Sequence, residues 1–274
     1  MREVFQERPW STVVAVFALV AVAALTPPAA AIGNGTLDTT HDYVGALIVP
    51  NPGVSGYTGV QDFIWCSGTL IAPRVFLVAA HCFDVIERFG FTAADMAVSL
   101  APNVMDDRKS WMAVESYARH PDYRTNPQQS GRLVDAHADQ DIGVAILTKA
   151  VRNVRPAVLA PVGFLDAYPD LKNAVFPFLG YGLNETSVLT GDRRIATTGF
   201  ASMGPSWLQL DGNPGKMCRF DSGGPTLLAW AGVEYQVGVH STVIGIPCDG
   251  PFADTRVDTA VARSFLDAAI AANA

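Results

Sequence analysis

In the stretch Cys218-Arg219-Phe220-Asp221-Ser222-Gly223-Gly224-Pro225, an acid precedes a serine and two glycines follow it. Such a segment is a poor start for a helix or a strand, and it is typical of a tight turn that exposes the serine hydroxyl. A hydroxyl is a weak nucleophile unless a base takes its proton and a third group orients that base. The stretch therefore predicts a histidine and an acid elsewhere in the chain.

Both residue types occur in strong local settings. His81 lies in Leu77-Val78-Ala79-Ala80-His81-Cys82, and Asp141 directly precedes the apolar run 142–147. That run predicts that Asp141 is buried, whereas Asp135 and Asp139 stand in polar sequence and are expected to be solvated. The order histidine, aspartate, serine is one of the known chain orders of a catalytic triad.

Together these segments resemble the chymotrypsin/trypsin family of serine endopeptidases, as a bacterial-type secreted member, over most of the chain after residue 31. The resemblance implies that Ser222 is the nucleophile and that His81 is first the general base and then the general acid. It also implies that Asp141 holds the imidazole tautomer. The sequence Cys-Ser-Gly-Thr-Leu-Ile at 66–71, with Ala-Ala-His-Cys at 79–82, supports this role for His81.

The same resemblance implies two further features around the nucleophile. The backbone N–H groups of Phe220 and Ser222 would form the oxyanion hole, although the family normally has glycine where Phe220 stands, and a Cβ restricts the dihedral angles that aim this N–H. A freed α-amino group at Ile32 would form an ion pair with Asp221. The matching N-terminal sequence is Ile32-Gly33-Asn34-Gly35.

The substrate pocket implied by the family contains Lys216, His240, Ser241 and Val243. Lys216 stands six residues before Ser222, at the pocket base, so specificity for arginine or lysine is not expected. His240 and Lys216 suggest an acidic P1 residue, while Val243 and Phe252 suggest a shallow pocket for small residues. The two alternatives stay open. Ser241 matches the serine that supports the catalytic aspartate.

Residues 1–31 are predicted to be a signal peptide. An unbroken apolar run of 13 residues, Val13 to Leu25, is too short for a membrane span, and Ala29-Ala30-Ala31 supplies a cleavage site. The mature protein is therefore expected to be secreted or periplasmic, with no stable membrane anchor. The four cysteines of an exported chain suggest disulfides, of which three pairings are conceivable. The resemblance implies Cys66–Cys82 and Cys218–Cys248.

Short strands separated by turns recur from Ile32 onward, which predicts an all-β barrel or sandwich, and the only convincing helical pattern begins at Val257. The predicted strands run over Val44 to Val49, Phe63 to Ile71, Val75 to Ala80, Met112 to Ala118, Gly143 to Leu147, Ala174 to Gly182, Arg194 to Ser202, Thr226 to Trp230 and Tyr235 to Ser241. The resemblance makes this two six-stranded antiparallel β-barrels with a C-terminal α-helix. The N-terminal barrel, 32–155, would carry the histidine and the aspartate, and the C-terminal barrel, 156–274, the serine. The segment Lys149 to Pro161 would cross between them.

The sequence thus predicts a serine endopeptidase that acts on polypeptides through an acyl-enzyme, as a monomer and without a cofactor. A catalytically weak binding protein on the same fold is the alternative, because Phe220 and an obstructed pocket would impair catalysis. A lipase-type hydrolase would want glycine where Phe220 stands. The net charge of −7 argues against a nucleic-acid partner. His41, His120 and His137 are interpreted as surface residues, and no pair has the spacing of metal ligands.

Overall fold

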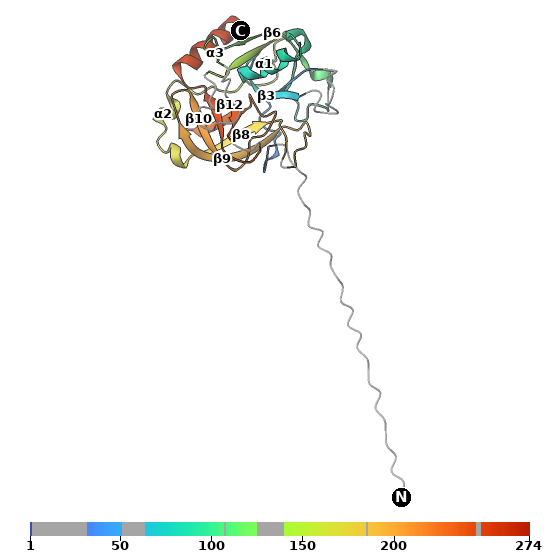
Figure 1. Ribbon diagram of the computed structural model, residues 1–274, viewed down its shortest axis with the longest axis vertical. Coiled ribbons are helices and arrows are strands. Elements are labelled where there is room, and N and C mark those ends of the chain that lie inside the picture. The colour runs from blue at the N-terminus through green and yellow to red at the C-terminus, as the bar shows by residue number, and fades with distance from the viewer. Residues whose placement is uncertain (2–31, 51–63, 107, 125–139, 185, 245–247) are drawn as a thin grey trace.

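Short antiparallel β-strands dominate the chain and form two barrels that lie side by side (Figure 1). The computed structural model describes Met1 and residues 32–50, 64–106, 108–124, 140–184, 186–244 and 248–274. The predicted signal peptide therefore lies outside the described residues, apart from Met1. So do Asp135, His137 and Asp139.

The first barrel closes in the order β2-β3-β4-β7-β6-β5. Val78 of β4 lies opposite Gly143 of β7, so the C-terminal end of one strand meets the N-terminal end of the other. This register matters because the two residues expected to form a base and its orienting acid leave the barrel at that edge. The strands of this barrel are β2 (Val44–Ile48), β3 (Ile64–Ala72), β4 (Val75–Val78), β5 (Ala97–Ser99), β6 (Met112–Arg119) and β7 (Gly143–Leu147).

The second barrel runs in the order β8-β9-β10-β13-β12-β11, and pairing of β11 with β8 closes it. The short strand β1 adds to β9 from outside, so the N-terminal segment is fastened to this barrel. Its strands are β1 (Thr36–Leu37), β8 (Val175–Gly180), β9 (Arg194–Met203), β10 (Trp207–Pro214), β11 (Pro225–Trp230), β12 (Val233–Val243) and β13 (Phe252–Arg256). The predicted fold class, two six-stranded barrels with a C-terminal helix, is confirmed.

Each barrel has its own apolar core, and a third cluster joins them. The joining cluster takes Val44, Ala46 and Ile48 from β2 of the first barrel and Leu179 and Leu227 from the second. Alternate residues of β2 point to one face of the strand, so this face packs against the neighbouring barrel. Buried apolar contacts therefore fix the position of one barrel relative to the other. The site described below takes residues from both barrels and requires this fixed arrangement.

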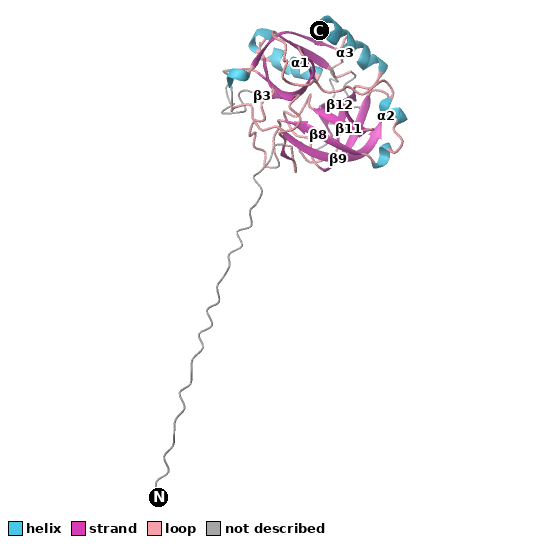
Figure 2. Cartoon of the chain, turned by 180° about the vertical axis from the view of Figure 1, so that it is seen from behind, coloured by secondary structure: helices cyan, strands magenta, loops and turns pink. Residues whose placement is uncertain are grey.

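Within the described residues, three α-helices pack on the barrels: α1 (Ala80–Arg88), α2 (Phe164–Ala167) and α3 (Ala260–Ala272). The C-terminal helix is confirmed, and the Thr259 hydroxyl caps it by accepting a hydrogen bond from the Ala262 N–H at 3.1 Å. Although α3 follows the last strand of the second barrel, its buried residues Ala262 and Leu266 belong to the core cluster of the first. Figure 2 shows it from behind on the side of α1.

The expectation of a single helix was wrong for α1. The apolar run from Val75 to Ala80 was predicted to be one strand, but the strand ends at Val78 and a helix begins at Ala80. Its buried side chains, Cys82, Phe83 and Ile86, recur at helical spacing and pack on the first barrel. Among the described strands, β1, β5, β10 and β13 were also missed.

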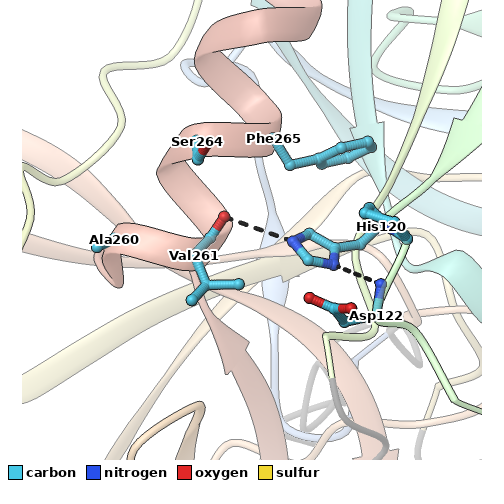
Figure 3. A pocket seen from close by; sticks show the side chains of 7 residues that line it. His120, Asp122, Ala260, Val261, Ser264 and Phe265 are labelled. Carbon is cyan, nitrogen blue, oxygen red and sulfur yellow. Dashed lines mark hydrogen bonds between the residues drawn. The ribbon is translucent and has the colours of Figure 1, made fainter.

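The expectation that His120 is a surface residue was wrong as well. Its side chain is only 4% exposed and lies between the end of β6 and helix α3 (Figure 3). The Asp122 N–H donates to Nδ1 at 3.1 Å, and Nε2 lies 3.4 Å from the Val261 carbonyl oxygen. The Phe265 ring meets the imidazole edge-on. His41 is likewise half-buried and paired with acids, rather than free on the surface.

Both predicted disulfides are present, Cys66–Cys82 and Cys218–Cys248. The first joins β3 to α1, and the second joins the turn before Ser222 to the segment before β13. By loop closure, each contributes on the order of 3 kcal/mol to the free energy of unfolding. In the described parts of the chain, no helix is both long enough and apolar enough to span a membrane.

Candidate active site

The ends of two paired strands bring His81 and Asp141 together. His81 is the second residue of α1, just after β4, and Asp141 stands two residues before β7. Because Val78 and Gly143 are partners in the β4–β7 ladder, both side chains emerge at the same edge of the first barrel. His81 is 28% exposed and Asp141 1% exposed, so the acid is buried behind the imidazole, as the sequence predicted for Asp141.

The Asp141 carboxylate accepts three hydrogen bonds that fix its orientation. Its Oδ1 accepts from the backbone N–H of His81 at 2.9 Å, and its Oδ2 lies 2.7 Å from His81 Nδ1. The Ser241 hydroxyl donates to Oδ2 at 2.6 Å. With Nδ1 turned to a carboxylate, the proton resides there and Nε2 is left as the basic nitrogen.

The pKa values of both groups are shifted in directions that suit a base with an orienting acid. Burial by itself would raise the pKa of Asp141, but His81 and the Ser241 hydroxyl outweigh it and lower that pKa. Burial by itself would lower the pKa of His81, but Asp141, and after it Asp84, outweigh it and raise that pKa. Asp141 therefore stays ionised, and it stabilises the imidazolium.

The Ser222 turn packs against the strand and helix that carry His81. The Ser222 carbonyl accepts a hydrogen bond from the Ser67 N–H on β3 at 2.9 Å, and it lies 3.9 Å from Cys82 Sγ. Gly223 has φ +86°, and a Cβ there would lie 2.9 Å from the Ala79 nitrogen, so only glycine fits. Within the described residues, the structure records no hydrogen bond between the Ser222 hydroxyl and His81. Such bonds are often long before a substrate binds.

Phe220 adopts a backbone conformation that favours glycine. Its φ is +74°, so the residue keeps a left-handed backbone conformation although its side chain disfavours positive φ. The Ser67 hydroxyl donates to the Phe220 carbonyl at 2.9 Å and accepts from the Tyr181 N–H at 2.8 Å, which holds the peptide in place. Among the described residues, no acceptor is recorded for the N–H of Phe220 or of Ser222. Both donors are therefore available to a ligand.

Asp221 is fully buried beneath this turn. Its carboxylate accepts hydrogen bonds from the N–H groups of Gly182 and Cys218, each at 2.8 Å. Burial outweighs these contacts and raises the pKa of Asp221 to about 7. Ile32 is also buried, in the core of the second barrel, and the next residue, Gly33, pairs with Lys216 through two backbone hydrogen bonds of 3.0 and 2.9 Å.

The four residues expected to form the substrate pocket differ in burial and in the groups that they contact. Ser241 touches Asp141, and half-buried Val243 lies opposite Phe252 in the β12–β13 ladder. Lys216 forms an ion pair with Asp249. His240 is fully buried, with Nδ1 3.0 Å from Asp254 Oδ1 and its ring against Phe178 and Phe252. The structure thus brings Ser241 into contact with the His81–Asp141 pair and places His240 in the core.

Two residues near the site were not singled out from the sequence. Ser67, which holds the Phe220 carbonyl, lies in the quoted Cys-Ser-Gly motif, so the signal was present but its role was not. Asp254, the partner of His240, lies in β13, which was itself missed. The described residues offer one grouping with close metal-ligand atoms, Cys66, Cys82 and His81, but both sulfurs are joined in a disulfide and cannot ligate.

Comparison with known proteins agrees with this geometry. The family model for trypsin matches residues 53–266, which is most of the chain. Brachyurin from Leptuca pugilator is 26% identical over 212 residues, an alignment that covers 72% of this chain and 85% of brachyurin. The match covers every strand from β3 to β13 and every residue from Cys66 to Ser241 discussed above, and on it the chain belongs to the trypsin family of serine peptidases.

Proposed function

We propose that this protein is a secreted or periplasmic serine endopeptidase, in which His81, Asp141 and Ser222 form the catalytic triad. Membership of the trypsin family supports a peptidase function. The observation that carries the residue assignment is the Asp141 carboxylate, which is buried and orients His81 through two contacts while Ser241 supports it. Two disulfides support an oxidising compartment.

In the proposed reaction, His81 Nε2 removes the proton from the Ser222 hydroxyl, and the oxygen attacks the carbonyl carbon of the scissile peptide bond. The carbonyl oxygen becomes an oxyanion that accepts hydrogen bonds from the N–H groups of Phe220 and Ser222. Losing one such donor costs about 3 kcal/mol in the transition state. His81 then gives its proton to the leaving amine, and an acyl-enzyme remains. Water, deprotonated by His81, releases the acid product and restores Ser222.

The activating ion pair between a free Ile32 amino group and Asp221 is part of the proposal. Support comes from Asp221 itself: its carboxylate is buried, and the hydrogen bonds recorded for it come from two backbone N–H groups. Non-tryptic specificity is also proposed, because position 216 holds a lysine, itself paired with Asp249, where an acid would be needed to bind a cationic P1 side chain. The acidic and the small P1 residue remain alternatives, to be separated by cleavage of a peptide library.

A fluorophosphonate probe tests the nucleophile. We expect it to label Ser222, and we expect His81→Ala to suppress the labelling rate. Asp141→Asn should keep the fold and lower kcat by about four orders of magnitude, because the imidazole is then held in the wrong tautomer. Undiminished hydrolysis by Ser222→Ala would refute the mechanism. The alternative is a catalytically weak binding protein, and the positive φ of Phe220 favours it. Wild-type protein that is folded, does not react with the probe and cleaves no library peptide would support that alternative.

A further inference from the structure

Helix α1 carries a second carboxylate close to His81. Asp84 stands three residues after His81 on the same helix, a spacing that places side chains on one face with Cβ atoms about 5–6 Å apart. Neither the triad nor the oxyanion hole uses Asp84. Its side chain is only one-fifth exposed, so solvent screens its charge incompletely.

Two partners hold the Asp84 carboxylate. Arg119 Nε, at the end of β6, lies 3.0 Å from Oδ1, and the Tyr123 hydroxyl donates to Oδ2 at 2.9 Å. Arg119 also forms an ion pair with Glu87 at 2.6 Å, one helical turn farther along α1. The helix that bears His81 is thus pinned to the first barrel by a charged cluster, beside the stacked rings of Phe83 and Tyr117.

The segment that carries Tyr123 also lies beside the orienting acid. The His120 N–H donates to the carbonyl of Ile142, the residue after Asp141, at 2.9 Å, and the Tyr123 N–H donates to the His120 carbonyl at 2.9 Å. Burial first, and then the charges of Asp141 and Asp84, raise the pKa of Tyr123. The phenol therefore keeps its proton and acts as a donor to Asp84 in the pH range in which a histidine titrates.

We propose that Asp84 is a positioning residue for the peptidase reaction: held by Arg119 and Tyr123, its carboxylate fixes helix α1 and adds a second negative charge beside His81. The inference rests on the proposed role of His81 as the general base. The imidazolium that forms at each proton transfer is stabilised by Asp141 in direct contact and by Asp84 through space. Arg119 opposes this effect, because its guanidinium contacts the Asp84 carboxylate and carries the opposite charge.

The described charged and titratable groups on the elements packed around His81 allow a signed prediction. Asp84 and Glu87 come from α1, Arg119 from β6, Tyr123 from the turn after it, and Asp141 from the segment before β7. Removing the Asp84 charge destabilises the imidazolium and lowers the pKa of His81. Removing the Arg119 charge does the reverse. A merely structural role for Asp84 would not produce opposite signs in the two variants.

The test is an NMR titration of the His81 imidazole in the Ser222→Ala protein, which needs no turnover. Relative to that protein, Asp84→Asn should move the His81 pKa down by about 0.5 pH unit, and Arg119→Gln should move it up by a similar amount. Glu87→Gln is the matched control, because Glu87 is also an acidic partner of Arg119 on α1 but lies farther along the helix from His81. Its shift should be less than half that of Asp84→Asn.

The same substitutions in the protein with Ser222 should move the acid limb of kcat/KM in parallel. No shift in Asp84→Asn, or an equal shift in Glu87→Gln, would overturn the proposal. If Asp84→Asn does not fold, Arg119→Gln decides alone, and an unchanged pKa there would overturn it too. If the wild-type protein cleaves no peptide, the proposed function fails, while the imidazole titration still judges Asp84.

Discussion

Phe220 is the residue at which the local backbone and the proposed chemistry conflict most. Its φ of +74° costs a residue with a Cβ on the order of 1–2 kcal/mol. The same peptide presents the N–H proposed for the oxyanion hole, while its carbonyl is held by Ser67. The strain is therefore stored where transition-state charge would develop, and it favours any relaxation that turns the donor away.

Replacing this residue by glycine should remove the strain while keeping the N–H. We expect Phe220→Gly to raise kcat by about 3- to 10-fold, and to change KM by less, because an oxyanion donor acts mainly in the transition state. Steady-state kinetics on one peptide substrate, beside Phe220→Ala, measure the effect. Alanine keeps the Cβ and should not reproduce the gain. A glycine variant that is slower on every substrate would mean that the Phe220 ring itself serves the site.

At the residue scale, the sequence was most informative where a residue type is embedded in a long local pattern. His81, Asp141 and Ser241 were named from such patterns. In the structure the His81 and Ser241 side chains both contact the Asp141 carboxylate. Burial of single histidines was not predictable, since His120 packs against helix α3 and His240 pairs with Asp254 of β13. Asp84 gave no signal at all, because its role arises only when α1 meets Arg119 and Tyr123.

At the scale of elements, the longer apolar strands were found, whereas the short strands β1 and β5 and the strands with charged or turn-forming residues, β10 and β13, were missed. In β10, Gly212, Asn213 and Pro214 resemble a turn, yet they continue the ladder to β9 through a bulge. In β13, Arg256 is buried because the carboxylates of Asp258 and Asp166 surround its guanidinium. A pattern based on hydrophobicity cannot anticipate a buried charge whose partners lie elsewhere.

At the scale of the whole molecule, the N-terminal segment is the part that connects processing to the site. We expect the exported protein to begin at Ile32, with its ammonium against the Asp221 carboxylate. Burial outweighs the hydrogen bonds from two backbone N–H groups and raises the pKa of Asp221 to about 7, and a neighbouring ammonium would offset that cost and keep the carboxylate ionised. N-terminal sequencing tests the first step. Full activity in protein that starts several residues before Ile32, or in Asp221→Asn across the pH range, would contradict the ion pair.

A second set of charges ties this segment to both barrels. The Asp38 carboxylate contacts His41 Nδ1 at 2.7 Å and Arg193 Nε at 2.8 Å, while His41 Nε2 lies 3.2 Å from Glu234 on β12. The Arg193 guanidinium also donates to the carbonyls of Val44 and Leu100 in the first barrel, each at 3.1 Å. His41 is therefore the titratable link in a cluster that spans the N-terminal segment and both barrels.

The pH dependence of stability follows from the His41 pKa. Burial would lower it, but the Asp38 and Glu234 carboxylates outweigh burial and raise it to about 9. A folded-state pKa above the unfolded value of about 6.5 means that the stabilisation is complete below pH 6.5 and is lost as pH rises through 9. We expect this cluster to lose about 3 kcal/mol of unfolding free energy over that window, measured by urea denaturation at pH 6, 8 and 10.

His41→Gln isolates this contribution, because glutamine can still bond Asp38 but carries no proton to lose. The variant should be less stable than the wild type at pH 6 and should approach it at pH 10, so the two curves converge. Asp42→Asn is the matched control: its carboxylate adjoins His41 in sequence but makes no recorded contact with it among the described residues, so its curve should run parallel to the wild type. A constant difference between His41→Gln and wild type at all three pH values would show that the imidazole acts by packing alone, because only an ionising group ties stability to pH.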